Sequence, residues 1–256
     1  MLSSNLFTTS ILATSLLFSS LAMAQESSGD KAPVTRDQLP ALVKEILLND
    51  PTILTQVIEK MQANQESVML AKAKEGITKN KKELFSDPNA PVVGPADADV
   101  TVVEFFDYHC GYCKQALSSI TKLLENDKKV RIVFKEYPIL SEDSRLASKA
   151  ALAVNRIAKD KYFEFHKAMF NVSGKIEERK ILAETTKLGI DEDKMKKELY
   201  NPELETILNK NRELGSSIGA VGTPSIVIGD NFYPGAIPYE AMKKAVDDVR
   251  AAKSKK

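Results

Sequence analysis

The chain has 256 residues, of which 43% are hydrophobic and 28% are charged, as in ordinary globular proteins with one core and an accessory segment. Its formal net charge of +1 excludes a strong electrostatic preference for acidic or basic partners. Two basic clusters, residues 79–82 and 253–256, have no interleaved aromatic side chains, so we expect solvated lysines there and no nucleic-acid partner.

The first segment, residues 1–24, is predicted to be a cleaved secretory signal peptide. It contains no charged side chain, and its apolar section is too short and too rich in Ser and Thr for a good membrane span. Ala22-Met23-Ala24 fits a small-x-small cleavage site. The segment lacks the usual Lys or Arg near its start, which leaves an uncleaved anchor as the alternative.

The region after the signal peptide is predicted to be a linker, residues 25–35, followed by helices over residues 36–86. Asp50 and Pro51 break the helical pattern and start it again, as N-cap and first helical residue. The apolar helix faces have little local bulk to cover them and must be buried elsewhere. We favour a homodimer or homotrimer over packing on the chain's own main domain. These faces contain Leu39, Leu42, Val43, Ile46, Leu47, Ile53, Leu54, Val57, Ile58 and Met61.

The main domain, residues 87–256, is predicted to have an α/β fold. Turn-forming residues over 86–100 mark its start. The pattern that follows predicts a β-α-β unit, a helical insert over residues 141–217, and a β-β-α unit. Strands are expected at 100–107, 130–138, 225–228 and 231–233, with flanking helices at 111–126 and 238–252.

The only two cysteines of the chain, Cys110 and Cys113, are separated by two residues. A disulfide across so short a loop constrains the unfolded chain little, so a purely structural role is disfavoured. A closed zinc site needs four ligands, and the chain adds only two histidines to the two thiols, so no resident metal is expected. A copper(I) site with two thiolate ligands remains open, but redox exchange is the best interpretation.

The cysteines stand where a predicted strand ends and a helix begins. Unpaired backbone N–H groups and the helix dipole stabilise a thiolate at such a position and lower the thiol pKa. Cys113 falls in the first helical turn, within reach of a mixed disulfide on Cys110. At a strand-to-helix junction in an α/β pattern, Cys-x-x-Cys is a strong signal of redox chemistry.

The sequence VVEFFDYHCGYCK, followed by IVFKEYP, a helical insert and VGTPSIVIG, resembles the DsbA-like thiol:disulfide oxidoreductases, which have the thioredoxin fold. The resemblance covers residues 92–250, most of the mature chain. The helical extension before LFSDPNAPVVG also resembles the oligomeric members of this group, of the Com type and the suppressor-of-copper-sensitivity type. The resemblance therefore implies a thioredoxin fold with an inserted helical subdomain and an N-terminal oligomerisation segment.

This resemblance implies roles for the residues around the cysteines. Cys110 corresponds to the attacking cysteine and Cys113 to the resolving one. Gly111-Tyr112 tunes the redox poise and meets the substrate, and Thr223-Pro224 matches a cis-proline loop that faces the disulfide.

A charged pair beneath the cysteines is implied as well. Glu104 matches a buried acid that exchanges a proton with Cys113, and Lys135 matches the lysine that keeps this charge paired. The strand pattern alone leaves another possibility open, namely that Glu104 lies exposed on an edge strand.

The expected function is thiol:disulfide interchange in the periplasm, with association with the outer membrane left open. The Gly-Tyr pair and Thr223 resemble the dimeric periplasmic isomerase more than the strongest oxidant, which favours isomerisation or reduction and leaves oxidation open. Cysteine-containing secreted or envelope proteins would be the substrates, a membrane redox protein the partner, and no cofactor is expected. The alternatives are a copper(I)-binding or chaperone-like protein, and an envelope structural protein with an incidental disulfide.

Overall fold

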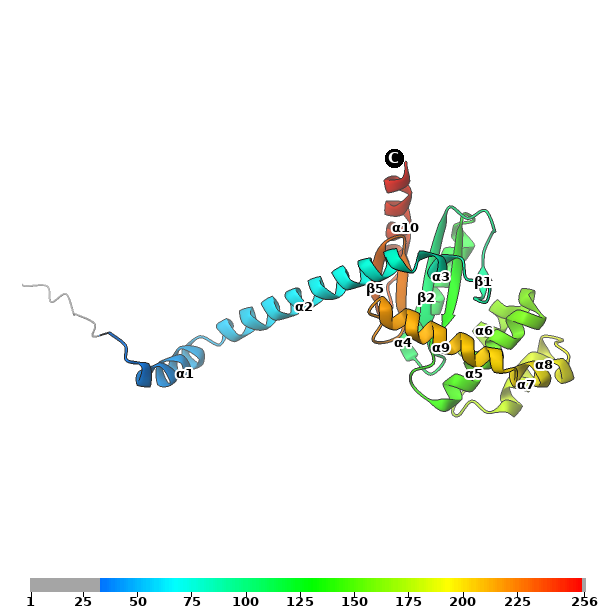
Figure 1. Cartoon of the computed structure of the whole chain (residues 1–256), viewed down its shortest axis with the longest axis horizontal. Coiled ribbons are helices and arrows are strands. Elements are labelled where there is room, and N and C mark those ends of the chain that lie inside the picture. Colours follow the sequence, from blue (N-terminus) through cyan, green and yellow to red (C-terminus); the bar gives the residue numbers. More distant parts are fainter. Residues whose placement is uncertain (1–32, 255–256) are drawn as a thin grey trace, which may run out of the picture. The chain divides into compact units, whose positions relative to one another are not determined.

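A computed structural model describes residues 33–254 of the chain (Figure 1). The predicted signal peptide and most of the predicted linker lie outside the described residues. The chain divides into two compact units between Gln56 and Val57, inside one long helix.

The first unit is helical. A short 3-10 helix, η1 (Arg36–Gln38), leads into α1 (Leu39–Asn49), and α2 (Thr52–Lys79) begins here and continues into the second unit. The break between α1 and α2 falls at the predicted place, where the Asp50 carboxylate accepts hydrogen bonds from the N–H and the hydroxyl of Thr52. Over residues 33–254, no helix is long and apolar enough to cross a membrane.

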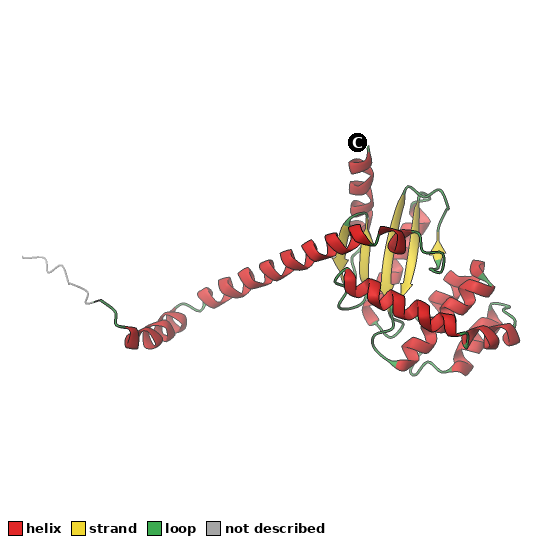
Figure 2. Cartoon of the chain, in the orientation of Figure 1, coloured by secondary structure: helices red, strands yellow, loops and turns green. Residues whose placement is uncertain are grey.

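A five-stranded mixed sheet forms the centre of the second unit, with strand order β1-β3-β2-β4-β5 (Figure 2). β2 and β3 run parallel, and the other neighbouring pairs run antiparallel. The two-residue β1 was not predicted, because it is too short to show an alternating pattern. The strands are β1 (Val92–Val93), β2 (Val100–Phe106), β3 (Val130–Glu136), β4 (Ser225–Ile228) and β5 (Asn231–Pro234).

Alternate residues of the central strands face two separate apolar cores, as the two-residue period of a strand requires. Val102 and Phe106 of β2 face the core that contains α4 (Gly111–Asn126) and α10 (Tyr239–Lys253). Val103 and Phe105 face the other core, which the last turns of α2 and α3 (Lys81–Phe85) cover. The sheet is therefore buried on both faces, which explains its nearly continuous apolar strands.

Helices occupy the segment over residues 141–217, for which the sequence predicts a helical insert. Its first helix starts at Ser141, whose hydroxyl caps it by accepting from the Ser144 N–H. The insert joins the core that contains α4 and α10. Its helices are α5 (Glu142–Ile157), η2 (Lys159–Lys161), α6 (Tyr162–Met169), α7 (Glu178–Lys187), α8 (Glu192–Leu199) and α9 (Pro202–Ser217).

The end of α2 belongs to the second unit and not to a separate N-terminal region. Ala73 and Ile77 of α2 and Leu84 of α3 are fully buried in the core behind the sheet. Gly76 lies so close to α9 that an added Cβ would stand 2.9 Å from the carbonyl carbon of Ser217. The boundary expected at residues 86–87 therefore differs from the structure, which divides the chain within α2.

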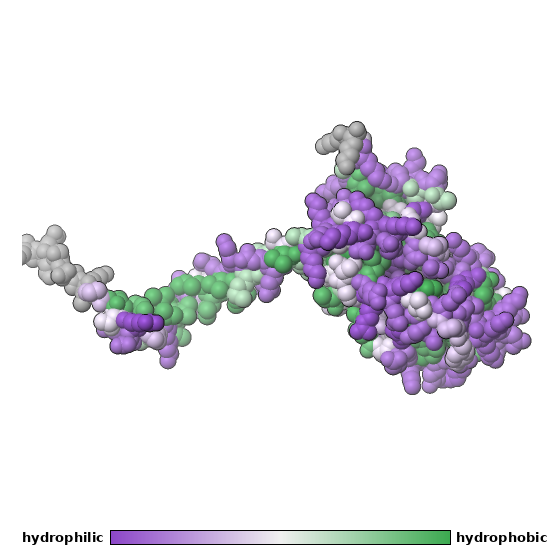
Figure 3. All heavy atoms as spheres, in the orientation of Figure 1, coloured by the Kyte–Doolittle hydropathy of each residue, from purple (hydrophilic) through white to green (hydrophobic). Residues whose placement is uncertain are grey.

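The apolar faces of α1 and of the first half of α2 are exposed. Figure 3 shows apolar side chains gathered along both segments. Burial of these faces against another subunit stays a prediction. The exposed residues are Leu39, Leu42, Val43, Ile46, Leu48, Leu54, Val57, Ile58 and Met61.

Candidate active site

The two cysteines stand at the start of α4, as predicted. Cys110 is the N-cap residue in an extended conformation, and Cys113 lies in the first turn. Cys110 is 8% exposed, whereas Cys113 is fully buried. The backbone N–H of Cys110 donates to the carbonyl of Asp107, which closes the turn between β2 and the helix. This placement leaves Cys110 as the thiol closer to solvent.

A loop just before β4 faces the first cysteine. The Cys110 thiol donates to the carbonyl oxygen of Thr223 at 3.1 Å, and the Thr223-Pro224 peptide bond is cis, as the resemblance implied. The hydroxyl of Ser225 fixes the loop by donating to the carbonyl of Gly222 at 2.8 Å. The first cysteine and the proline loop are thus in direct contact.

Glu104 lies beneath the cysteines on the central strand β2, so the alternative of an exposed edge strand is excluded. Its side chain belongs to the same sheet face as Phe106 and α4, and the residue is 2% exposed. Burial raises the pKa of Glu104 to about 8. Burial, followed by the negative charge of Glu104, also raises the pKa of the Cys113 thiol. The two groups are therefore within electrostatic reach of one another.

The predicted pairing of Lys135 with Glu104 is not found. Lys135 is aligned with Phe105 in the parallel register, and Glu104 with Phe134, so the two charged side chains point to opposite faces of the sheet. Lys135 Nζ instead lies 2.6 Å from the Asp87 carboxylate. The lysine side chain is buried on the face of the sheet opposite to Glu104. Glu104 therefore has no lysine partner from β3.

Asp107 is a site residue that the sequence analysis missed. It is fully buried at the end of β2, and its carboxylate accepts four hydrogen bonds. Oδ1 accepts from the His109 N–H at 2.8 Å and the Ser144 hydroxyl at 2.7 Å. Oδ2 accepts from the N–H groups of Ile139 and Leu140 at 2.8 and 2.9 Å. Asp107 thus ties the cysteine turn to the segment that leads into α5.

A second buried acid, Glu136, was also missed. It ends β3 on the same sheet face as Glu104, and Tyr162 donates to its Oε1 at 3.2 Å. The hydroxyl of Tyr108, two residues before Cys110, lies 3.5 Å from the same oxygen and 3.1 Å from His166 Nδ1. Burial raises the pKa of Glu136 well above its usual range and lowers that of His166 to about 3. Burial therefore disfavours the charged form of both groups.

Within residues 33–254, no group of three or more His, Cys, Asp or Glu side chains could hold a metal ion. The sequence contains one signal for Asp107 and Glu136. Each is a charged residue at the end of an apolar strand, in FFDY and VFKEYP respectively.

Comparison with known proteins agrees with this geometry. The family model of the DSBA-like thioredoxin domain matches residues 101–247. The chain is 27% identical over 168 residues to disulfide bond formation protein D of Bacillus subtilis, covering 61% of this chain and 75% of that protein.

Two solved structures are also similar. The thiol-disulfide exchange protein alpha-DsbA2 of Wolbachia pipientis has 35% identity and a TM-score of 0.65, covering 69% of this chain and 95% of that one. The compact conformation of ScsC from Proteus mirabilis has 27% identity and a TM-score of 0.65, covering 86% of this chain and 100% of that one.

Fold and site together define a thioredoxin-fold thiol:disulfide oxidoreductase. The residues matched by the family model include both cysteines, Glu104 and the cis-proline loop. The chain belongs to the family of DSBA-like thioredoxin domains, and its activity is thiol:disulfide interchange with cysteine-containing proteins.

Proposed function

We propose that this chain is a periplasmic enzyme that isomerises and reduces disulfides in secreted or envelope proteins, and that it acts as a homodimer or homotrimer. The observation that carries the proposal is the exposed apolar face of α1 and α2 on a chain that also holds a dithiol site. Isomerisation requires prolonged contact with a misfolded protein, and several subunits around one cleft offer more contact surface than one. Oxidation of substrate thiols remains within the chemistry of the same site.

The proposed reaction begins at Cys110. Its thiolate attacks a sulfur of a substrate disulfide, forms a mixed disulfide and releases one substrate thiolate. Cys113 then loses its proton to the ionised fraction of Glu104, attacks the Cys110 sulfur and releases the second substrate thiolate. The substrate is thereby reduced by two electrons and the Cys110–Cys113 pair is oxidised. In isomerisation, another substrate thiol resolves the mixed disulfide, and the Cys110 thiolate is regenerated.

Exposed apolar side chains around Cys110 suit an unfolded polypeptide as substrate. Val221, two residues before Thr223, is 91% exposed, and Tyr112, between the cysteines, is 64% exposed. Ile139 and Leu140, whose N–H groups bind Asp107, are also exposed. Misfolded proteins expose apolar residues that folded proteins bury. An apolar surface around Cys110 therefore binds misfolded proteins in preference to folded proteins.

Location and assembly are supported by the comparisons. The signal-like residues 1–24 and the similarity to a periplasmic thioredoxin-like protein of Salmonella enterica support secretion into the periplasm. The similarity to ScsC extends over 86% of the chain and so reaches into the N-terminal helices. We place the signal peptide at residues 1–24, the linker at 25–35, and the oligomerisation surface on α1 and the first half of α2. A membrane redox protein would restore the dithiol.

The decisive experiment is refolding of a substrate with scrambled disulfides by the mature chain, with reduction of oxidised glutathione measured in parallel. Recovery of native substrate is expected with the wild type and not with Cys110→Ser. Glutathione reduction without recovery of the scrambled substrate would contradict isomerisation and would identify the protein as a general disulfide reductase. Accumulation of new disulfides in a reduced substrate, again without rescue of the scrambled one, would identify an oxidase.

A further inference from the structure

The segment between α9 and β4 contains the cis-proline loop and passes abruptly from the core to solvent. Ala220 is 3% exposed, whereas the next residue, Val221, is almost completely exposed. Gly219 and Gly222 stand on either side of this pair, and glycine gives the backbone more conformational freedom than any other residue. The segment therefore needs ties to the rest of the fold to keep the loop in place against Cys110.

Within the described part of the chain, two hydrogen bonds tie this segment, up to Thr223, to distant parts of the sequence. The Cys110 thiol donates to the Thr223 carbonyl. The hydroxyl of Tyr137, the residue that follows β3, donates to the Ala220 carbonyl at 2.9 Å. The remaining hydrogen bonds join the segment to α9 or to Ser225 at the start of β4. Only the first two therefore fix the loop relative to the central strands and the cysteines.

The two ties differ in what happens to them during the reaction. The Cys110 thiol has one proton, which is lost when the thiolate forms and is absent from a mixed disulfide. The sulfur can then no longer donate to Thr223. The Tyr137 hydroxyl takes no part in these steps, so its hydrogen bond persists. Tyr137 is therefore the distant tie that still holds the loop while a substrate is attached to Cys110.

The Tyr137 side chain is itself held on several sides. Its backbone N–H donates to the carbonyl of Phe106 at 2.9 Å, at the end of β2. Its ring meets the ring of Phe105 edge to face, with centroids 5.6 Å apart. The ring also lies so close to α9 that a Cβ added to Gly215 would stand 2.6 Å from Cε2 of Tyr137. The buried hydroxyl is thus fixed in place before a substrate arrives.

We infer that Tyr137 is a positioning residue, whose hydroxyl holds the proline loop in the place where polypeptide substrates bind beside Cys110. A polypeptide disulfide meets the exposed loop as well as the sulfur, whereas a small disulfide needs the sulfur alone. A loop that is already ordered binds more tightly, because less conformational freedom is lost on binding. Tyr137 therefore favours polypeptide disulfides over small ones. The inference rests on the proposed binding of unfolded polypeptides at this loop.

Tyr137→Phe tests the inference, because it removes the hydroxyl and keeps the ring. The buried Ala220 carbonyl then loses its partner, and the segment must shift to reach water. Single-turnover mixing of the complete, reduced mature protein with an unstructured peptide that contains one disulfide gives the half-saturating concentration and the maximal rate. We expect the half-saturating concentration to rise about fivefold, the usual net effect of one hydrogen bond, with the maximal rate unchanged. The rate with hydroxyethyl disulfide should also stay unchanged.

Tyr200→Phe is the matched control, because it removes a tyrosine hydroxyl that donates to Glu178 within the helical insert. It should leave the rates with both disulfides unchanged. NMR relaxation gives a readout without any substrate: the backbone order parameters of Val221 and Thr223 should fall in Tyr137→Phe.

Unchanged order parameters in Tyr137→Phe would overturn the inference. An unchanged half-saturating concentration for the peptide, or an equal loss with both disulfides, would do the same. Neither result affects the recovery of scrambled substrates by the wild type, which tests isomerisation separately. A wild type that fails to isomerise can still be compared with Tyr137→Phe on the peptide disulfide.

Discussion

The Cys110 thiol lies 3.1 Å from the carbonyl oxygen of Thr223, a residue 113 positions further along the chain. This contact sets the cis-proline loop against one side of the first cysteine. Cys113 is fully buried behind it in the first turn of α4. A substrate disulfide that approaches along the loop therefore meets Cys110 and cannot reach Cys113 without opening the helix.

The two cysteines should consequently behave differently when substituted. Cys113→Ser should accumulate mixed disulfides with substrate proteins, because nothing resolves the bond to Cys110. Cys110→Ser should accumulate almost none, since its remaining thiol is buried and burial raises the thiol pKa. Mass spectrometry of non-reduced complexes distinguishes the two reduced variants after incubation with an unfolded substrate that contains disulfides, because the attack of a thiolate on a substrate disulfide forms the mixed disulfide. Equal trapping by both would show that the assignment of the attacking thiol is wrong.

Glu104 should reduce the stability of the folded protein at alkaline pH. Burial raises its folded pKa from 4.5 to about 8. Between these values the folded state binds the proton and the unfolded state releases it, so the free energy of unfolding falls as pH rises. Glu104→Gln removes this loss and should be more stable than the wild type above about pH 8, by roughly 3–5 kcal/mol. The two proteins should converge below about pH 4.5, as measured by urea denaturation of the reduced forms.

The same variant tests the proton transfer from Cys113. Glu104→Gln should slow the resolution of the mixed disulfide most around pH 8, where much of Glu104 is ionised and can accept the proton, and the defect should shrink at still higher pH as the thiol ionises unaided. Stopped-flow mixing with a peptide disulfide measures this step. A defect of constant size at all pH values would indicate that Glu104 only fills space.

The local patterns of the sequence were sufficient to predict most of the second unit. Apolar runs located the central strands, the cysteine motif located the start of α4, and turn residues delimited the helical insert. These features depend on neighbouring residues only. The cis-proline loop was found through the family resemblance, because the cis state of an X–Pro bond has no local signal strong enough to predict it.

The errors and omissions concern pairings between distant segments. Lys135 pairs with Asp87 because the register of β2 and β3 turns it away from Glu104, and the sequence does not contain that register. Asp107 and Glu136 acquire their roles only when loops and helices from the insert close around them. The burial of Ala73 and Ile77 likewise depends on α9, which lies far along the chain.

Asp107→Asn should loosen the cysteine turn. Asparagine keeps one oxygen, so at least one pair of donors, on either the His109 or the Leu140 side, would lose its acceptor. We expect a loss of about 2–4 kcal/mol in the free energy of unfolding and slower alkylation of Cys110. Ser144→Ala, which removes a single donor, is the matched control and should have a clearly smaller effect. Equal effects of both variants would mean that the carboxylate itself is not the organising group.

Gly76→Ala tests the anchoring of α2 on the second unit. Alanine normally stabilises a helix relative to glycine by about 1 kcal/mol. Here the added Cβ would collide with the Ser217 backbone, so we expect destabilisation of about 1–3 kcal/mol in urea unfolding. Gly111→Ala is the control, because no atom lies within 4 Å of the Cβ it would add. A stabilised Gly76→Ala protein would show that α2 is not held against α9.

The exposed face of α1 and α2 should hold the subunits together. Burying about six of its side chains between chains contributes several kcal/mol, at about 25 cal/mol per Å², enough for a dimer or trimer after ordering costs. Leu54→Glu combined with Ile58→Glu places two charges on this face and should yield a monomer by light scattering. The double variant should still reduce glutathione but lose most of its isomerase activity.

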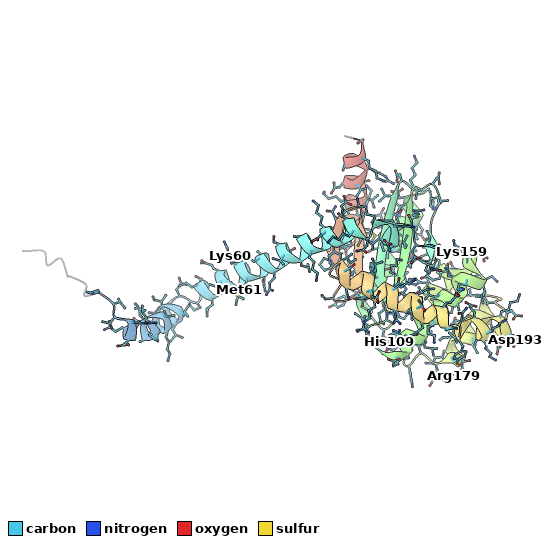
Figure 4. All side chains as sticks on the ribbon, in the orientation of Figure 1. Lys60, Met61, His109, Lys159, Arg179 and Asp193 are labelled. Carbon is cyan, nitrogen blue, oxygen red and sulfur yellow. The ribbon has the colours of Figure 1, made fainter. Side chains whose placement is uncertain are left out.

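The control for this variant is Lys60→Glu, which changes the charge of the same helix at an exposed polar position near Met61 (Figure 4). It should leave the mass of the assembly unchanged, because a lysine in water contributes little to an apolar contact. A monomeric wild type would remove the structural support for isomerisation. A monomer from Lys60→Glu as well would mean that helix charge, and not the apolar face, determines assembly.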